Sequence, residues 1–361
     1  MQYDDIHFNC QVIDSYNKPF NLIQSCRSSG KTTDLARKII KAYDKEGAPS
    51  LILRRQIVDI TEQYIDDFRK VINNFRDEDN QIEFYYHKGD MKAGICDIYT
   101  SMDDLKRKNN IFLRVIGLNA KKQRLKGGVL MNVRYILFDE FMIDMRKGEK
   151  YLPDEISRFE ELYTTYLRES TKLRCYFLGN AYSYFSPYHA YFKLNPNDIH
   201  LGCLIVNNRC CFNLFKPSDE LIEILKNNPL FDISDEYEQY ALYGVPINDT
   251  KIKIEPKLPQ FFKLFCVFNI NGSHLGIYYD CANSGLGFSL YCMNIKWSDT
   301  YKRIAYTFDL RDVSSSCYIP TQSIIKTFYP IKRAMMSYNI AYNNINSSYT
   351  LEMIFSMLPS V

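Results

Sequence analysis

Apolar residues in the first 214 positions fall into two alternating patterns. Short continuous apolar runs, typical of strands buried on both faces of a sheet, alternate with apolar residues at helical spacing. The runs predict strands at 21–24, 50–54, 84–86, 95–99, 112–116, 135–138 and 174–178. The helical spacing predicts helices at 32–45 and 60–75, and a third that begins at Pro153. This alternation predicts an α/β domain with a doubly wound, mostly parallel sheet.

The pattern changes after residue 214. Two short acidic helices are predicted at 219–226 and 235–243, with Ser218 and Ser234 as their N-caps. From residue 257, the predicted elements are strands at 264–270, 276–279, 287–293 and 304–310, then helices at 321–342 and 351–358. The chain is therefore divided into an α/β domain at 1–214, a helical linker at 215–256 and an α+β domain at 257–361.

Composition limits the class of protein without changing this division. The 361 residues are 46% hydrophobic and 24% charged, which is typical of a globular chain long enough for two cores. The apolar runs are too short to cross a bilayer, and the first residues lack the basic and apolar regions of a signal peptide. The eleven cysteines include no C-x-x-C pair. We expect a protein with reduced cysteines that stays where it is made, with no membrane partner.

The segment between the first predicted strand and the first predicted helix has the pattern of a phosphate-binding loop. It reads Ser25-Cys26-Arg27-Ser28-Ser29-Gly30-Lys31-Thr32-Thr33. In such a loop, backbone N–H groups surround the phosphates of a nucleoside triphosphate such as ATP. Lys31 is expected to reach the β- and γ-phosphates, and the Thr32 hydroxyl to bind Mg²⁺. Ser25 stands where the usual pattern has its first glycine, so the loop departs from that pattern at one position.

Two adjacent acids follow the buried strand predicted at 135–138. Asp139 and Glu140 lie at the carboxyl end of this strand, the edge at which open α/β sheets bind ligands. Asp139 is the candidate to support Mg²⁺, and Glu140 is the candidate base that activates water. A second acid beside the first favours an ATPase, and pairing with Lys31 weakens the alternative of an ordinary strand end. Asn180, at the tip of the next strand, is either a γ-phosphate sensor or a turn former.

Charge is distributed unevenly, although the net charge is only +3. Residues 105–138 include nine Lys or Arg and no acid, whereas residues 216–249 include eight acids and two Lys. The basic stretch contains a loop with four cations ahead of two glycines: Lys121, Lys122, Arg124 and Lys126. Such a loop can follow the phosphate backbone of duplex DNA, and no aromatic residues are interleaved for stacking on single strands. We interpret it as a DNA-binding loop, with a solvated charged face as the alternative.

Several segments resemble the genome-packaging ATPases (encapsidation motors) of small short-tailed bacteriophages, which are related to terminase large subunits. The resemblance rests on the Arg-containing phosphate-binding loop, on the pair Arg54 and Arg55, and on residues 138–141 around the two acids. It continues through 151–155, 167–168, 173–175, 178–181, 186–188 and 265–280. The match is dense from 20 to 195 and looser after 257.

The resemblance implies an ASCE-type P-loop ATPase whose subunits form a homomeric ring, generally a pentamer, on the portal of an empty capsid. It implies that ATP and Mg²⁺ bind between subunits and that an arginine of one subunit completes the neighbouring site. Arg168 matches this arginine by position, and Arg146 is a rival on spacing alone. The implied partners are double-stranded DNA, the portal and, as in some relatives, a structural RNA. The implied location is the host cytoplasm and, transiently, the procapsid, but not the mature virion.

The resemblance also implies that residues 257–361 form an RNase H-like domain, related to the terminase nuclease but degenerate. Nuclease chemistry needs several carboxylates around two metal ions. The carboxylates that the domain offers are Asp280, Asp299, Asp309, Asp312 and Glu352. We expect this domain to bind nucleic acid or the portal without cutting, with an active terminase-like nuclease as the alternative.

The sequence therefore predicts an ATP-driven translocase that moves double-stranded DNA through a portal into a preformed capsid. A ring helicase is one alternative, and it predicts stimulation by single-stranded nucleic acid and strand separation. A non-catalytic structural component is another, and it predicts no ATP turnover with Mg²⁺.

Overall fold

The computed structural model divides into two compact units, which we call the N-terminal unit and the C-terminal unit. The N-terminal unit comprises residues 1–182 and 201–247, and the C-terminal unit comprises residues 183–200 and 248–361. The residues that the structure describes are 6–121, 130–144, 147, 149–152, 154–170, 172–184, 186–195, 198–227, 235–244, 246, 252–270, 273–282, 287–307, 317, 319–320 and 322–356.

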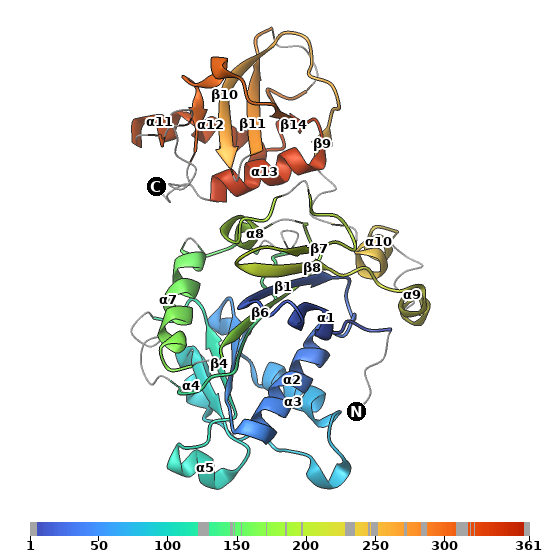
Figure 1. The fold of residues 1–361 in the computed structure, drawn as a ribbon, viewed down its shortest axis with the longest axis vertical. Coiled ribbons are helices and arrows are strands. Elements are labelled where there is room, and N and C mark those ends of the chain that lie inside the picture. The colour runs from blue at the N-terminus through green and yellow to red at the C-terminus, as the bar shows by residue number, and fades with distance from the viewer. Residues whose placement is uncertain are drawn as a thin grey trace. The chain divides into compact units, whose positions relative to one another are not determined.

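An eight-stranded sheet forms the centre of the N-terminal unit (Figure 1). The order of the strands in the sheet is β3-β4-β2-β5-β6-β1-β8-β7. The six central strands (β4, β2, β5, β6, β1 and β8) are parallel to one another. The two edge strands, β3 and β7, are antiparallel to their neighbours. This confirms the predicted mostly parallel sheet. The strands are β1 (Phe20–Ser25), β2 (Ser50–Arg54), β3 (Ile95–Ile98), β4 (Leu113–Gly117), β5 (Tyr135–Asp139), β6 (Arg174–Asn180), β7 (Leu204–Val206) and β8 (Cys210–Leu214). The strand predicted at 84–86 is wrong, because Tyr85 makes only an isolated bridge to Tyr99.

Helices cover both faces of this sheet (Figure 1). Side chains on consecutive strand positions point to opposite faces, so Tyr176 joins the core beneath α2 while Phe177 packs on Phe159 of α7, with ring centroids 5.0 Å apart. The three long helices are α2 (Lys31–Glu46), α3 (Glu62–Asn73) and α7 (Glu155–Leu167), and a single helical turn, α1 (Gln11–Asp14), precedes β1. Shorter helices are η1 (Ile57–Asp59), η2 (Glu78–Asn80), α4 (Lys88–Ala93) and α5 (Met102–Arg107).

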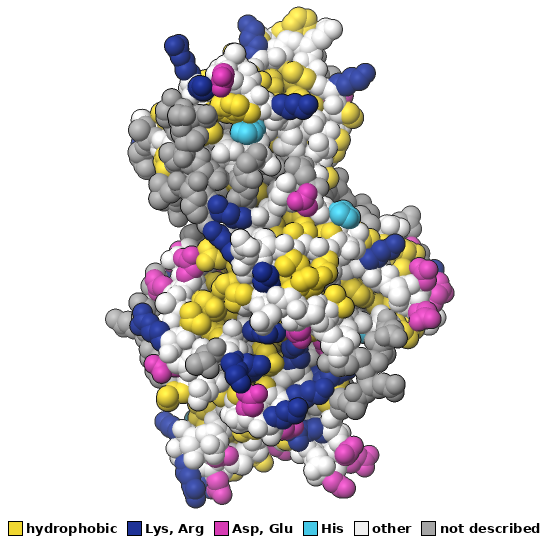
Figure 2. All heavy atoms as spheres, viewed as in Figure 1, with side chains coloured by type: hydrophobic (Ala, Val, Ile, Leu, Met, Phe, Trp, Pro, Cys, Tyr) yellow, Lys and Arg dark blue, Asp and Glu magenta, His cyan; other side chains and the backbone are white. Residues whose placement is uncertain are grey.

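The two acidic helices belong to the N-terminal unit rather than to a separate linker. These are α9 (Asp219–Leu225) and α10 (Asp235–Tyr243). The Ser218 side chain accepts a hydrogen bond from the backbone N–H of Leu221, so the predicted cap of α9 is confirmed, whereas Ser234 lies outside the described residues. Figure 2 shows the acidic side chains gathered over α9. Tyr240 of α10 is fully buried and stacks on Tyr182, with ring centroids 5.2 Å apart, which explains why α10 groups with this unit.

A six-stranded sheet of order β13-β10-β11-β12-β14-β9 forms the C-terminal unit. Strands β10, β11 and β12 are antiparallel neighbours, and parallel strands extend the sheet on both sides. The strands are β9 (Lys253–Ile254), β10 (Phe262–Ile270), β11 (Ser273–Asp280), β12 (Leu290–Ile295), β13 (Ala305–Tyr306) and β14 (Ile340–Tyr342). The helices are α8 (Pro187–Tyr191), η7 (Asp299–Tyr301), α11 (Gln322–Thr327), α12 (Tyr329–Met336) and α13 (Ile345–Ser356).

Two features of the C-terminal unit differ from the prediction. The helix predicted at 321–342 is two helices followed by strand β14, because the chain turns at Tyr338 (φ 53°) and residues 340–342 then pair with β12. Residues 183–200 group with this unit rather than with the first, and the ring of Tyr184 lies 6.5 Å from that of Tyr349 on α13.

All eleven cysteines are free, and no helix in the described part of the chain is long and apolar enough to span a membrane.

Candidate active site

The predicted phosphate-binding loop connects β1 to α2. Ser28 and Gly30 both adopt left-handed backbone conformations, with φ of 56° and 88°. Gly30 has a second constraint, because a Cβ atom there would lie 3.1 Å from the Cβ of His7. The loop thereby ends at the first turn of a 16-residue helix, whose unpaired N–H groups and positive dipole end favour an anion.

Lys31 is buried beneath this loop. Its ammonium group donates hydrogen bonds to Ser25 Oγ (2.5 Å), to the Cys26 carbonyl (3.0 Å) and to Asn180 Oδ1 (3.3 Å). Burial lowers the pKa of Lys31 to about 8. A triphosphate would supply the negative charge that these neutral acceptors lack. Ser25 therefore does more than replace a glycine, because its hydroxyl accepts a hydrogen bond from Lys31.

A cavity of about 240 Å³ brings together most of the predicted ATP-site residues. The sheet order explains this, because β6 lies between β1 and β5 and places Asn180 beside Ser25, while Leu178 pairs with Asp139. The predicted residues that line this phosphate cavity are Ser28, Ser29, Gly30, Lys31, Thr32, Thr33, Asp139, Glu140 and Asn180. A cation, a hydroxyl and carboxylates at a helix N-terminus fit a triphosphate with Mg²⁺, which prefers hard oxygen ligands.

The first three residues of the loop, Ser25, Cys26 and Arg27, do not line the phosphate cavity. Ser25 and Cys26 are fully buried, and burial raises the pKa of the Cys26 thiol. Arg27 donates hydrogen bonds to the hydroxyls of Tyr182 (3.3 Å) and Tyr240 (3.4 Å). Arg27 thereby connects the loop to the end of β6 and to α10.

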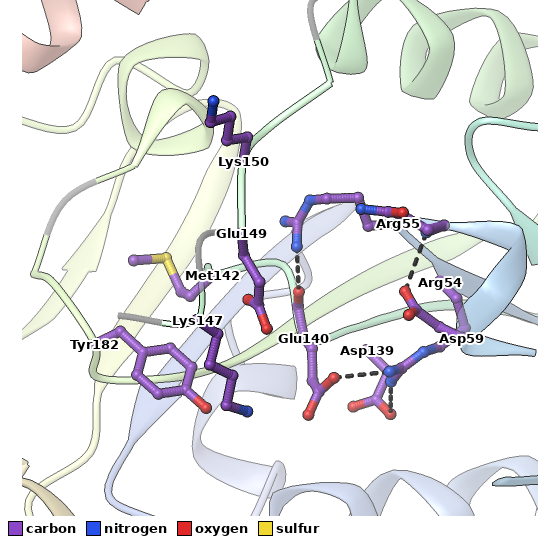
Figure 3. A pocket seen from close by; sticks show the side chains of 11 residues that line it. Arg54, Arg55, Asp59, Asp139, Glu140, Met142, Lys147, Glu149, Lys150 and Tyr182 are labelled. Carbon is purple, nitrogen blue, oxygen red and sulfur yellow. Dashed lines mark hydrogen bonds and ion pairs between the residues drawn. The ribbon is translucent and has the colours of Figure 1, made fainter. Parts of the chain in front are cut away.

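Arg54 lies between the two candidate catalytic acids (Figure 3). Its guanidinium donates to Asp139 Oδ2 at 3.0 Å and to Glu140 Oε2 at 2.7 Å. The Tyr64 hydroxyl also donates to Asp139 Oδ2, at 3.0 Å. Burial raises the pKa of Asp139, and the positive charge of Arg54 opposes that shift. The side chain of Glu140 is 55% exposed, so water reaches its carboxylate.

Arg55 holds the backbone around Glu140. It donates to the carbonyls of Glu140 (3.1 Å) and Phe141 (2.6 Å), and to Glu155 Oε2 (2.9 Å). Glu140 itself has a left-handed backbone, with φ of 59°, and these bonds fix that conformation. The sequence assigned no role to Arg54 or Arg55. The available signal in the sequence was a pair of arginines at the end of a predicted buried strand, which the structure pairs with β5.

Replacing Glu155 with Ala is expected to lower the free energy of unfolding by about 3–5 kcal/mol, because Arg55 would stay buried without its counter-charge. The two side chains are only 8% and 3% exposed. Urea unfolding followed by circular dichroism measures the change. Glu160→Ala, at an exposed position of the same helix, is the control and is expected to change stability by less than about 0.5 kcal/mol. Equal unfolding midpoints for the two variants would rule out a stabilising role for this buried pair.

Arg168 lies at the far end of α7 from this site. The helix begins at Glu155, which contacts Arg55, and runs for 13 residues, so Arg168 lies about 20 Å further along its axis. Arg168 is exposed and lines a separate hollow with Glu160, Glu161 and Glu169. It therefore does not contribute to the phosphate cavity of its own chain. Its rival Arg146 lies outside the described residues.

The other predicted sites are only partly described. Lys121 is exposed after β4, and Lys122, Arg124 and Lys126 lie outside the described residues. In the C-terminal unit, Asp280 ends β11, Asp299 begins η7 and Glu352 lies on α13, whereas Asp309 and Asp312 fall outside the description. Among the residues described, no group of three His, Cys, Asp or Glu side chains is placed to hold a metal ion.

Comparison with known proteins relates this chain to phage packaging motors. The model of the podovirus DNA encapsidation protein (Gp16) family matches residues 3–338. The DNA packaging protein of Bacillus phage phi29 is 27% identical over 296 residues, covering 78% of this chain and 77% of the relative. The DNA packaging protein of Bacillus phage B103 is 27% identical over 280 residues, covering 74% of this chain and 76% of the relative.

Two solved structures share the fold over nearly the whole chain. The phi-28 gp11 DNA packaging motor gives a TM-score of 0.63 at 14% identity, covering 99% of both chains. The bacteriophage phi-29 viral genome packaging motor assembly gives a TM-score of 0.56 at 20% identity, covering 98% of this chain and 100% of the other.

Proposed function

Because this chain belongs to the podovirus DNA encapsidation protein family, we propose that it is an ATP-driven translocase that packages a double-stranded DNA genome into a preformed capsid. The two phage relatives are DNA packaging proteins, which supports a role of this chain in DNA packaging. The observation that carries the proposal is that Lys31, Asp139 and Glu140 line one cavity together. A phosphate-binding lysine, a metal-supporting acid and a second, half-exposed acid are the parts that ATP hydrolysis needs.

We assign each part of this cavity a role. The loop N–H groups and Lys31 bind the phosphates of ATP, and Thr32 with Asp139 holds Mg²⁺, which neutralises charge on the phosphates when bound. Glu140 orients the attacking water and accepts its proton at the carboxylate. Asn180 contacts the γ-phosphate, because it already bonds to Lys31. Arg54 positions both acids.

We propose that the protein works as a homomeric ring, with five subunits as the family resemblance implies, on the capsid portal. Arg168 of one subunit then completes the ATP site of its neighbour. The position of Arg168, about 20 Å along α7 from the start of the helix, supports a role outside its own site. The match to a packaging motor assembly also supports this arrangement. A structural RNA adaptor, the host-cytoplasmic location and the transient procapsid location belong to the same proposal.

DNA contacts are assigned to the basic loop that begins at Lys121 and to the C-terminal unit. Four cations in six positions can neutralise phosphates of a duplex without sequence preference. We propose that the C-terminal unit is a degenerate RNase H-like domain that does not cut DNA. The antiparallel trio β10, β11 and β12, flanked by parallel strands, supports this relationship.

The proposal predicts Mg²⁺-dependent ATP hydrolysis that duplex DNA stimulates severalfold and single-stranded DNA stimulates less. The reason is that the basic loop follows duplex phosphates and carries no interleaved aromatic residues for stacking. Phosphate release, measured with each DNA and with procapsids that carry their portal, checks this. Stronger stimulation by single strands together with strand separation would indicate a helicase. No turnover under any of these conditions would indicate a structural component.

A further inference from the structure

A second cavity adjoins the phosphate-binding loop. Its volume is about 490 Å³, which is within the range of small-molecule sites. Ser28, Gly30 and Thr33 line both this cavity and the phosphate cavity, so the two cavities adjoin the same part of the loop. Asp139 and Glu140 line the phosphate cavity but not this second cavity.

The N-terminal segment forms one wall of this second cavity and is bonded to the loop and to α2. The backbone N–H of Phe8 donates to the Ser29 carbonyl at 2.8 Å. The N–H of Cys10 donates to Asp34 Oδ2, also at 2.8 Å. His7 lies against Gly30, where a Cβ atom would be only 3.1 Å away. The wall is therefore built by specific contacts.

Another part of the cavity wall presents flat side-chain surfaces. The guanidinium carbon of Arg37 lies 5.0 Å from the ring centroid of Phe75. Arg37 also forms an ion pair with Asp34, at 3.4 Å. Because Asp34 is occupied by Arg37 and by the N–H of Cys10, this wall offers planar aromatic and guanidinium faces rather than a free carboxylate.

We infer that this cavity binds the nucleobase of the nucleoside triphosphate, stacked on Phe75 and Arg37. The inference rests on the proposed function, which places the phosphates in the loop. Hydrolysis requires the γ-phosphate to face Glu140, so the ribose and base must leave the loop at its other end, past Thr33. That end opens into the cavity, and aromatic rings and guanidinium planes are the groups on which bases stack.

Phe75→Ala in the full chain is expected to raise the dissociation constant of a non-hydrolysable ATP analogue about tenfold and to leave that of inorganic tripolyphosphate unchanged. Tripolyphosphate carries the same phosphates without a base, so titration calorimetry of the two ligands with Mg²⁺ separates the two ends of the site. The KM for ATP is expected to rise by the same factor with kcat unchanged, because stacking holds the ground and transition states equally. Phe75→Trp is expected to restore the affinity.

Phe84→Ala is the matched control. Its ring also packs at the edge of the same core, 5.5 Å from Phe112, but does not line the cavity. The control is expected to reproduce any loss of stability without changing the preference for ATP over tripolyphosphate. Equal weakening of both ligands by Phe75→Ala, or no weakening of either, would overturn the nucleobase site while the ATPase proposal stands. Wild-type protein that binds neither ligand and hydrolyses no ATP would overturn the proposed function itself.

Discussion

Glu140→Gln is expected to lower kcat for ATP hydrolysis by about 10²–10⁴-fold while ATP still binds. Glutamine has the shape of glutamate but cannot accept the proton of the attacking water. Its amide oxygen can still accept the hydrogen bond from Arg54, so the geometry around Asp139 is retained. Phosphate release at saturating ATP measures the loss, and calorimetry with a non-hydrolysable analogue measures the retained binding.

Glu149→Gln is the control for this result. Glu149 lines a cavity that is also lined by Arg54, Asp139 and Glu140 (Figure 3). Its carboxylate accepts a hydrogen bond from the backbone N–H of Asp144 at 2.8 Å. A glutamine can accept that bond as well, so most of the activity is expected to remain. Glu140→Gln protein with more than about a tenth of wild-type kcat would show that Glu140 is not the general base.

Arg168→Ala is expected to lower DNA-stimulated ATP hydrolysis on procapsids by about 10³–10⁵-fold, the range measured for arginines that complete a neighbour's site. The loss should be recovered in part when Arg168→Ala subunits are mixed with Glu140→Gln subunits. In a head-to-tail ring, some interfaces of the mixture combine an intact Arg168 with an intact Glu140. Activity plotted against the mixing ratio is therefore expected to pass through a maximum.

Lys172→Ala, at an exposed cation close to the same helix end, is the control and is expected to keep near-wild-type activity. Sedimentation of the loaded procapsids checks that each variant still assembles. An Arg168→Ala protein with normal activity, or a mixture as inactive as both parents, would exclude the proposed trans role. In the second case the arginine acts within its own subunit or supports assembly.

Most of the central sheet could be predicted because its signals are local. Each buried parallel strand is a short apolar run, and the loop from Ser25 to Thr33 carries its own pattern. The same argument failed for residues 340–342, which continue a helical spacing in the sequence but form β14. Pairing with β12 decides their conformation, and that partner lies about 50 positions earlier.

The sequence by itself determined the strand and helix alternation of the N-terminal unit and the residue types of a phosphate-binding loop and a paired acid motif. Only the tertiary structure decided that Arg54 bridges Asp139 and Glu140, and that Arg55 holds the backbone between them and Glu155. It also decided that His7 and Phe75 line one cavity. The physical reason is that backbone conformation and burial leave periodic patterns in neighbouring residues, whereas ion pairs and cavities are made by residues far apart in the chain. Their proximity depends on strand order and helix packing, which no local pattern encodes.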